Sequence, residues 1–419
     1  MAVTPDWYRE GMGHIWLPYT QMKTATPPQP VVKADGVRLT LADGTELIDG
    51  ISSWWAAVHG YNHPHIIGAM KKQLELMPHV MFGGLVNEPA LKLAKRLATM
   101  LPGDLNRTFI AESGSVSVEV AMKMAVQYFI NRGEKRSKFV HFRGTYHGDT
   151  LGTMSVCDPE EGMHGLFSDI LIKNLLTDLP RTEAEALVFK AYLKKHAHAV
   201  AAVITEPLVQ GAGGMVFHGP ETLGWLREAC DEAGVLLIVD EIFTGFYRTG
   251  SRFAVDQASI VPDMITLSKA LSGGVTPLSV CVAREEIFDA FYDDDANKAL
   301  MHGPTYMGHA LGCAAANASL DLFEAEDYAL KVQAIERQLE TELEPCRKRS
   351  NVKDVRVKGA IGVVHLHDAS NIETLKLKFV AEGVWIRPFG DIVYLTPPLT
   401  ISESDLRVLT GAINKILSA

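Results

Sequence analysis

The chain has 419 residues, of which 47% are hydrophobic and 21% charged, and its formal net charge is −10. This length predicts two or three globular domains, and the composition excludes a disordered or low-complexity protein. The negative balance argues against nucleic acid or an anionic membrane as the main partner, because both would repel the chain.

The sequence carries no sign of export or membrane insertion. No apolar run approaches the ~18 to 20 residues that a membrane-spanning helix needs. The N-terminal segment mixes Pro5, Asp6, Arg9 and Glu10, so it lacks the apolar core of a secretory signal. The five cysteines are widely scattered without a CxxC pair, which is typical of reduced thiols. We therefore expect a cytoplasmic protein.

The first predicted element is a hairpin over residues 37–48, which turns at Asp43-Gly44. Through the middle of the chain, short apolar runs alternate with longer helical stretches, which indicates an α/β fold with a mostly parallel sheet covered by helices. The runs are residues 108–111, 139–142, 200–204, 235–239, 264–267 and 278–282.

From about residue 310 onward the pattern changes to helices and a few alternating strands, such as residues 384–387 and 393–395. This change indicates a second, smaller α+β domain. We expect residues 56–310 to form the large domain, and residues 1–55 and 311–419 to form the small one.

Polar or glycine-containing residues follow the predicted strands of the large domain. In open α/β sheets, ligands bind at the carboxyl ends of the strands, so these residues mark one candidate site. They are Glu112-Ser113-Gly114-Ser115, residues 143–147, Glu206, Asp240-Glu241 and Ser268-Lys269.

Lys269 directly follows an apolar strand and precedes small residues. Desolvation at such a position favours the neutral amine, which can attack an aldehyde. The alternative is a lysine that merely reaches solvent from the strand end.

Asp240 ends the strongly apolar run 235–239. A carboxylate at the end of a buried strand needs a cationic partner. The alternative is an aspartate that caps the following helix.

Ser113-Gly114-Ser115 precedes a helical pattern that continues to about residue 130. Free backbone N–H groups and a hydroxyl at a helix start suit a phosphate, whereas a plain capping motif is the alternative. The later Gly211-Ala212-Gly213-Gly214 does not have the spacing of a dinucleotide-binding GxGxxG motif.

The histidines His59, His63 and His65 raise the question of a metal site. Gly60 and Pro64 break any helix that would align them, and no second cluster completes a set of four ligands. We expect no metal and assign these side chains to local packing.

A helix-start phosphate site, an acid at one buried strand end and a lysine at the next are together the components of pyridoxal-phosphate chemistry. The acid would pair with the protonated pyridine nitrogen of the cofactor, and the lysine would hold its aldehyde carbon.

Two segments, Asp240–Gly250 and Ser268–Gly274, resemble the class III (ω-type) aminotransferases of pyridoxal-phosphate fold type I. The resemblance implies that Asp240 binds the pyridine nitrogen and that Lys269 holds the cofactor. It further implies that Gly114 and Ser115 bind the phosphate and that Tyr146 stacks on the ring.

Further motifs are similar to one subfamily of this class and extend the resemblance over almost the whole chain. They are residues 14–20, 49–57, 59–64, 79–84, 302–308 and 385–390. Trp54-Trp55 and Met81-Phe82-Gly83-Gly84 are not general features of class III enzymes, so these two segments discriminate within the class.

The subfamily resemblance implies a substrate pocket lined by Tyr19, Trp54, Tyr146, Lys269 and Gly303. We count Tyr19 together with Lys269 as the candidate catalytic residues.

Two further roles follow from the same resemblance. Pro304 and Thr305 would reach the cofactor phosphate of a neighbouring subunit, which implies a homodimer with shared active sites. Arg387 would bind a substrate carboxylate, with Arg248 as a second candidate and a structural salt bridge as the alternative for both. Tyr394 either joins the pocket or packs the small domain.

Tyr247 departs from the commonest class III pattern, in which glycine often stands between the phenylalanine and the arginine. We expect the family to tolerate this change because the flanking motif is intact. Three rival interpretations remain: another class III aminotransferase, a cofactor-free interaction protein on the same fold, and a nicotinamide oxidoreductase, which lacks its glycine motif here.

Overall fold

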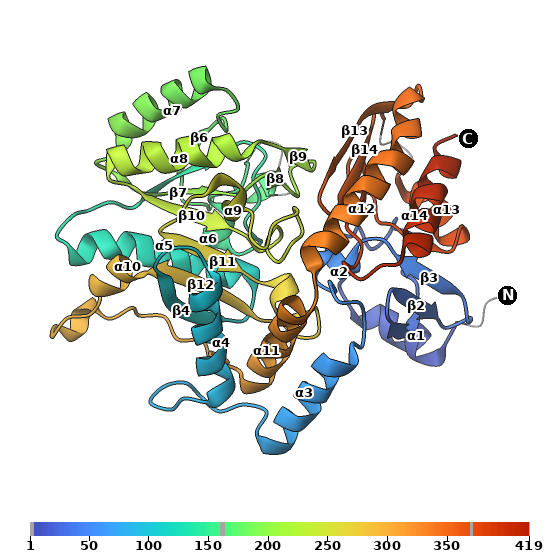
Figure 1. The fold of residues 1–419 in the computed structure, drawn as a ribbon, viewed down its shortest axis with the longest axis horizontal. Coiled ribbons are helices and arrows are strands. Elements are labelled where there is room, and N and C mark those ends of the chain that lie inside the picture. Colours follow the sequence, from blue (N-terminus) through green and yellow to red (C-terminus); the bar gives the residue numbers. More distant parts are fainter. Residues whose placement is uncertain (1–3, 160–163, 369–371, 419) are drawn as a thin grey trace. The chain divides into compact units, whose positions relative to one another are not determined.

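The computed structural model describes residues 4–159, 164–368 and 372–418. The chain divides into two compact units, one formed by residues 1–64 and 330–419 and the other by residues 65–329 (Figure 1). The domain boundaries expected after residues 55 and 310 stay predictions. Within the described residues, no helix is both long and apolar enough to cross a membrane.

The unit of residues 65–329 is built on a seven-stranded sheet in the order β4-β12-β11-β10-β7-β5-β6. Every recorded strand pair in it is parallel except those that β12 makes with β11 and β4. The strands are β4 (Leu105–Ala111), β5 (Lys138–Phe142), β6 (Leu175–Thr177), β7 (Val200–Thr205), β10 (Leu236–Asp240), β11 (Met264–Leu267) and β12 (Ser279–Arg284). The mostly parallel sheet expected from the sequence is confirmed.

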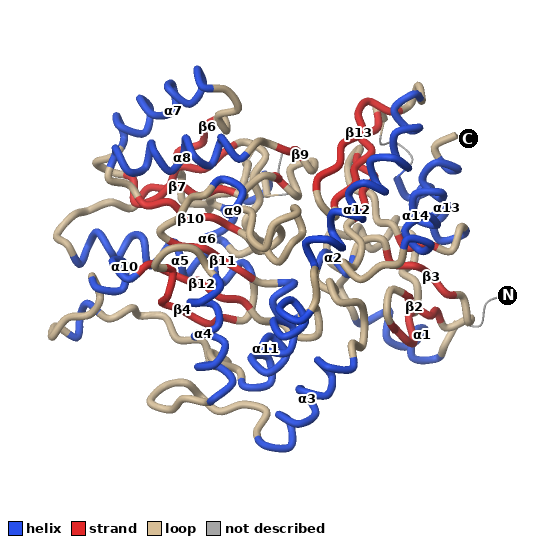
Figure 2. The backbone as a smooth tube through the Cα atoms, in the orientation of Figure 1, coloured by secondary structure: helices blue, strands red, loops and turns tan. Residues whose placement is uncertain are grey.

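This unit also contains helices, most of which lie against the sheet (Figure 2). They are α3 (Pro64–Leu76), α4 (Glu88–Met100), α5 (Gly114–Asn131), α6 (Leu151–Met154), α7 (Glu183–His196), α8 (Pro220–Ala233), α9 (Val255–Ala258), α10 (Glu285–Asp289) and α11 (Ala310–Ala325). Shorter elements are the 3₁₀ turns η2 (Gly165–Phe167), η3 (Lys269–Ser272) and η4 (Ala296–Lys298), and the ribbon of β8 (Val209–Gln210) and β9 (Val216–Phe217).

Both faces of the sheet are buried, which explains why its strands read as nearly continuous apolar runs. In β10, Leu236 and Ile238 join a core cluster with side chains of α5. Leu237 and Val239 are equally buried and point to the other face, because side chains alternate along a strand. Helix α8 packs on β10 outside that cluster.

The other unit contains a four-stranded sheet in the order β1-β2-β3-β15 and a three-stranded sheet in the order β13-β14-β16. The strands are β1 (Val31–Asp35), β2 (Arg38–Leu41), β3 (Glu46–Asp49), β13 (Val352–Lys358), β14 (Ile361–Leu366), β15 (Val384–Trp385) and β16 (Ile392–Leu395). The other elements are α1 (Asp6–Gly11), η1 (Met12–His14), α2 (Ser52–Trp55), α12 (Tyr328–Leu343), η5 (Glu344–Lys348), α13 (Ile372–Ala381) and α14 (Glu403–Ile416).

The hairpin expected over residues 37–48 is formed by the antiparallel strands β2 and β3. It turns at Gly44, whose φ of 87° lies in the left-handed region that glycine adopts readily. Strand β15 then adds in parallel beside β3, so that segments from both ends of the chain share one sheet.

Candidate active site

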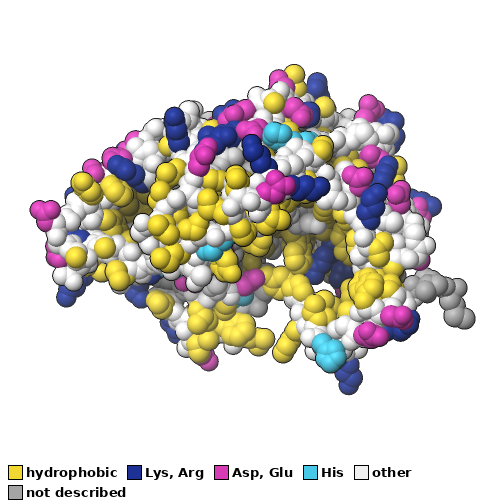
Figure 3. All heavy atoms as spheres, turned by 90° about the horizontal axis from the view of Figure 1, so that it is seen from below, with side chains coloured by type: hydrophobic (Ala, Val, Ile, Leu, Met, Phe, Trp, Pro, Cys, Tyr) yellow, Lys and Arg dark blue, Asp and Glu magenta, His cyan; other side chains and the backbone are white. Residues whose placement is uncertain are grey.

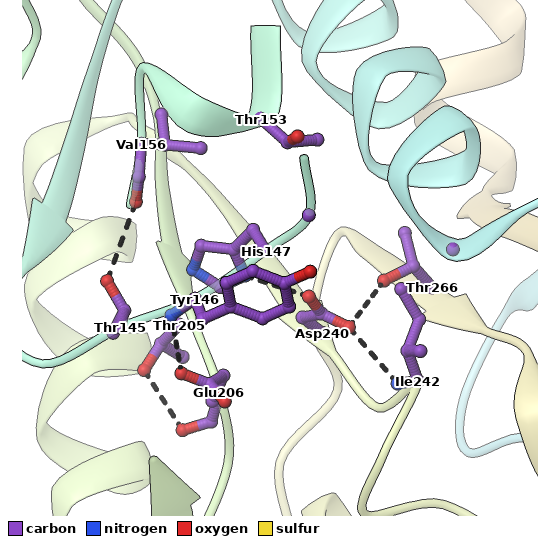
Figure 4. Close-up of polar contacts among 12 residues, drawn as sticks. Thr145, Tyr146, His147, Thr153, Val156, Thr205, Glu206, Asp240, Ile242 and Thr266 are labelled. Carbon is purple, nitrogen blue, oxygen red and sulfur yellow. Dashed lines mark hydrogen bonds and ion pairs between the residues drawn. The ribbon is translucent and has the colours of Figure 1, made fainter. Parts of the chain in front are cut away.

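Asp240 ends strand β10 on the face of the sheet that α5 covers. Leu236 and Ile238 pack with α5, and alternation directs Asp240 to the same side. The carboxylate is buried. Its Oδ1 accepts hydrogen bonds from the backbone N–H of Ile242 (3.1 Å) and from the hydroxyl of Thr266 (3.2 Å) (Figure 4).

The remaining oxygen of Asp240, Oδ2, lies 2.8 Å from Nδ1 of the buried His147, which follows strand β5. His147 Nε2 has no hydrogen-bond partner among the described residues. Residues 242–249 form turns rather than a helix, so Asp240 does not cap a following helix. Sequence reasoning placed His147 only within the segment 143–147 and missed this pairing.

Lys269 lies at the end of the neighbouring strand β11, at the start of the 3₁₀ turn η3. Its φ of 47° is in the left-handed region, which is uncommon for a residue with a side chain. Nζ lies 5.8 Å from the centre of the Phe243 ring. Burial lowers the pKa of Lys269 to about 8, although Asp240 and Glu206 act in the opposite direction. The amine is therefore neutral in a larger fraction of molecules near neutral pH than an exposed lysine would be.

This lowered pKa predicts a pH-dependent stability for the cofactor-free protein. Between pH 8 and the ordinary lysine value of 10.5, the unfolded chain binds more protons at this position than the folded chain. The free energy of unfolding should therefore rise with pH across this window, at most by about 1.4 kcal/mol for each step of one in pH. Urea denaturation of the wild type and of Lys269→Met isolates the effect. Parallel pH profiles for the two proteins would contradict it.

Helix α5 begins at the same edge of the sheet. Ser113 caps it, with its hydroxyl accepting from the N–H of Val116 at 3.4 Å, so capping is part of the motif's role. Gly114 and Ser115 occupy the first turn, whereas the sequence placed the helix start just after them. A Cβ on Gly114 would meet Ile242 at 3.0 Å, which brings this turn close to the segment after Asp240.

Tyr146 follows β5 and is tied to the buried Glu206. The backbone N–H of Tyr146 donates to Glu206 Oε2 at 2.9 Å (Figure 4). The backbone N–H of Gly211 donates to Glu206 Oε1, also at 2.9 Å. The Tyr146 ring stacks on His164 with the ring centres 5.9 Å apart. Burial raises the pKa of Glu206 to about 7. Sequence reasoning noted Glu206 as a strand-end residue but did not predict that it holds Tyr146.

Gly303, Pro304 and Thr305 lie in a loop that follows His302, whose ring is 5.7 Å from that of Phe109 in β4. Gly303 and Thr305 are exposed. The preceding residues are held to α5, since Lys123 Nζ donates to the carbonyl of Met301 at 2.7 Å. Lys269 interacts electrostatically with Asp240 and Glu206, and Tyr146 is hydrogen-bonded to Glu206. Gly303 and Thr305, in contrast, are exposed on the surface of the single chain.

The predicted substrate-binding residues Tyr19, Trp54 and Arg387 belong to the other unit, where Tyr19 and Arg387 each lie against Trp54. The Tyr19 and Trp54 rings are 6.2 Å apart in an edge-to-face arrangement. The guanidinium carbon of Arg387 lies 4.9 Å from the centre of the Trp54 ring. Tyr394 is buried in the same unit, with its ring 6.2 Å from that of Trp55.

Tyr247 adopts a φ of 71°, a conformation that glycine reaches without strain. This backbone requirement explains why glycine often occupies the position in class III sequences. Here the ring is buried and lies 5.8 Å from Phe323 and 6.0 Å from Tyr328. Packing on these rings offsets the strain. The adjacent Arg248 is buried within the same unit.

The histidines near residue 60 show packing rather than ligand geometry. His59 is buried, and its ring lies 6.3 Å from that of His63 in an edge-to-face contact. Within the described ranges, no group of three or more His, Cys, Asp or Glu side chains is arranged to hold a metal ion.

The residues at the sheet edge suit pyridoxal phosphate by their chemistry. The buried Asp240 offers an anion to a protonated ring nitrogen, and the half-buried Lys269 offers an amine of lowered pKa to an aldehyde. The first turn of the 18-residue helix α5 offers N–H groups to a phosphate. The three groups occur on neighbouring elements of one unit, as a single cofactor requires.

The class III aminotransferase family model matches residues 19–417. The chain belongs to the class III aminotransferases. It is 42% identical over 412 residues to the adenosylmethionine-8-amino-7-oxononanoate aminotransferase of Buchnera aphidicola subsp. Acyrthosiphon pisum, covering 97% of this chain and 96% of that protein. It is also 42% identical to the Mycobacterium leprae protein of the same name, covering 96% and 94%.

Among solved structures, the adenosylmethionine-8-amino-7-oxononanoate aminotransferase of Methanocaldococcus jannaschii matches with a TM-score of 0.93 and 33% identity, covering 98% of both chains. An (S)-enantioselective ω-transaminase from Thermomicrobium roseum matches with a TM-score of 0.88 and 28% identity, covering 98% of this chain and 97% of that one.

These matches confirm the fold expected for a class III aminotransferase, namely fold type I with an α/β sheet and a smaller α+β part. This class III aminotransferase is an enzyme, and its cofactor is pyridoxal phosphate. The relatives also carry the name of the subfamily that the Trp54-Trp55 and Met81-Phe82-Gly83-Gly84 segments indicated. The roles of individual residues remain proposals.

Proposed function

We propose that this enzyme transfers the amino group of S-adenosylmethionine to 8-amino-7-oxononanoate, which gives 7,8-diaminononanoate in biotin biosynthesis. The observation that carries the proposal is the identity of about 40% over nearly the full chain to relatives named for this reaction. The two segments that discriminate within the class agree with it.

When bound, pyridoxal phosphate supplies an aldehyde that accepts amino groups and a cationic ring that stabilises negative charge on the neighbouring carbon. Asp240 would hold the ring nitrogen, and His147 fixes the orientation of the Asp240 carboxylate through the 2.8 Å contact. Gly114 and Ser115 would hold the phosphate, and Tyr146 would lie against the ring.

Lys269 would anchor the cofactor and then move a proton at the carbon that carries the amino group. A pKa of about 8 suits a base at neutral pH, because a useful fraction of the amine is unprotonated while the conjugate acid can still return the proton. Since donor and acceptor react in turn in one pocket, the kinetics should be ping-pong.

Tyr19, Trp54 and Arg387 would form the substrate-binding surface. Both proposed substrates carry a carboxylate, and the planar guanidinium of Arg387 can bind one with two hydrogen bonds. The Tyr19 and Trp54 rings would contact the apolar parts of two otherwise different molecules. The Tyr19 hydroxyl is the further catalytic candidate at this surface.

We propose that the enzyme acts in the cytoplasm as a homodimer in which Pro304 and Thr305 reach the partner's cofactor phosphate. Exposed apolar side chains gather on the face seen in Figure 3, as interfaces between subunits require. The exposed large apolar residues include Leu76, Met81, Leu85, Val86, Met301 and Tyr306. Sedimentation equilibrium should give twice the mass of the chain, and a monomer at micromolar concentration would refute this arrangement.

A half-reaction tests the proposed function. Mixing the purified yellow enzyme with S-adenosylmethionine alone should bleach its visible absorption, and adding 8-amino-7-oxononanoate should restore the colour and yield diaminononanoate. Bleaching by lysine but not by S-adenosylmethionine would show that lysine is the amino donor. An enzyme that bleaches with simple amines and never forms diaminononanoate would be another class III aminotransferase.

A further inference from the structure

Residues Ser52 to Trp55 form a turn of left-handed helix. Their φ angles are 48°, 46°, 56° and 72°, and none of the four is a glycine. Left-handed helical conformation is unfavourable for a residue with a side chain, because its Cβ comes too close to the following carbonyl oxygen. Four such residues in succession persist only where the surroundings enforce the conformation, and strain of this kind concentrates at functional sites.

The buried carboxylate of Asp49 is hydrogen-bonded to the turn and to the residue that precedes it. Its Oδ1 accepts the N–H of Ile51 at 2.8 Å, and its Oδ2 accepts the N–H of Ser53 at 3.0 Å and the hydroxyl of Tyr61 at 2.6 Å. The Tyr61 hydroxyl also contacts the hydroxyl of Ser53. Three donors therefore converge on one carboxylate beneath the turn.

A second anchor lies at the start of the turn. The hydroxyl of Ser52 donates to the carbonyl of Thr396 at 2.8 Å, and the N–H of Thr396 donates to the carbonyl of Gly50 at 2.8 Å. This anchor fixes where the turn begins. The Asp49 carboxylate bonds to the N–H of Ser53 within the turn itself, and the N–H groups of Trp55 and Ala56 close the turn on the carbonyls of Ile51 and Ser52, each at 2.8 Å.

The turn presents Trp54 to Arg387. Trp54 is 38% exposed, and the guanidinium carbon of Arg387 lies 4.9 Å from the centre of its ring. Stacking on an indole restricts a guanidinium and leaves its N–H fork directed for a carboxylate. A right-handed turn would send consecutive side chains in other directions, so Trp54 would leave Arg387.

We propose that Asp49, assisted by Tyr61, is a positioning residue that fixes the left-handed turn and so holds Trp54 against Arg387 for the binding of carboxylate substrates. The inference rests on the proposed function, because it takes Arg387 as the carboxylate-binding residue. Asp49 touches neither substrate nor cofactor in this scheme and acts only through the turn.

The test is Asp49→Asn, in which one oxygen becomes an NH₂ group that cannot accept a hydrogen bond. KM for 8-amino-7-oxononanoate should rise about 10- to 100-fold, as expected when buried donors lose their acceptor. kcat should fall less than about threefold and the cofactor absorption should not change. The matched control is Asp405→Asn, which weakens the 2.7 Å ion pair with Arg38 in the same unit. It should leave KM unchanged.

A second pair of variants separates positioning from general destabilisation. Glycine adopts the φ of residue 53 without strain, so Asp49→Asn with Ser53→Gly should recover part of the KM loss. The double variant Asp49→Asn with Ser53→Ala also lacks the Ser53 hydroxyl, but alanine keeps the backbone strain at residue 53. Its KM should therefore stay as high as that of Asp49→Asn. Equal KM values for the two double variants would overturn the inference, as would a loss of kcat and cofactor binding in Asp49→Asn.

A spectroscopic comparison needs no substrate. The near-ultraviolet circular dichroism of Trp54 is the difference between the wild type and Trp54→Phe. The same difference measured in the Asp49→Asn background should be strongly reduced, and an unchanged difference would overturn the inference. If S-adenosylmethionine proves not to be a donor, the proposed function fails, while this comparison still decides whether Asp49 positions Trp54.

Discussion

Lys269→Ala is expected to abolish turnover, with kcat lower by at least about 10⁴-fold, the upper range for removal of a general acid–base residue. The Nζ atom would serve both as the covalent anchor of the cofactor and as the base at the reacting carbon, so one substitution removes two functions. Its position at the end of β11 and its pKa of about 8 support both roles.

The measurement combines steady-state rates with mass spectrometry of peptides after borohydride reduction. Wild-type enzyme should carry the reduced cofactor on the peptide that contains residue 269, and the variant should carry none. Lys194→Ala, which removes an exposed lysine of helix α7, is the control and should keep both rate and label. A Lys269→Ala enzyme with a normal rate would remove the lysine from the mechanism.

The strands that carry the site were largely predictable from the sequence. Strand β11 has the predicted limits, and β10 differs from its prediction by one residue at each end. Buried parallel strands are short and apolar throughout, so their ends are sharply marked by polar residues such as Asp240 and Lys269. Strand β6 was missed because it has three half-buried residues at the edge of the sheet. The apolar sequence of β12 predicts a strand but does not indicate that the strand runs antiparallel to its neighbours.

The pairing of His147 with Asp240 was not predictable, because it depends on the order of strands in the sheet. β5 and β10 are separated by β7, and only this arrangement brings the segment after β5 to the end of β10. The same holds for the bond from Tyr146 to Glu206. A single sequence reveals which residues end the strands but not which strands are neighbours.

The left-handed turn at Trp54 was also beyond prediction from the residues. Positive φ angles are usually indicated by glycine, asparagine or aspartate, and Ser52 to Trp55 contains none of them. The cause is the buried carboxylate of Asp49, whose three donors are known only once the fold is known.

Asp240→Asn is expected to lower kcat by roughly 10²–10³-fold, the usual cost of removing one preorganised electrostatic contact to a reacting group. The amide has nearly the shape of the carboxylate but no charge, so it cannot keep a proton on the ring nitrogen. It also disturbs the contact with His147 Nδ1 at 2.8 Å. The Lys269 amine is still present in this variant, so borohydride labelling should persist. This persistence distinguishes the result from that of Lys269→Ala.

Asp263→Asn supplies the matched control for Asp240. Asp263 is also a buried carboxylate, but it lies at the N-terminal end of strand β11, whereas Lys269 lies at the C-terminal end of this strand. It bonds to the N–H of Leu237 at 2.7 Å and pairs with Arg227 at 2.8 Å. Its replacement should reduce stability because a buried ion pair is broken, while kcat of the folded enzyme stays within about threefold. If Asp240→Asn behaved like Asp263→Asn, losing stability but not kcat, the Asp240 charge would serve the fold and not the reaction.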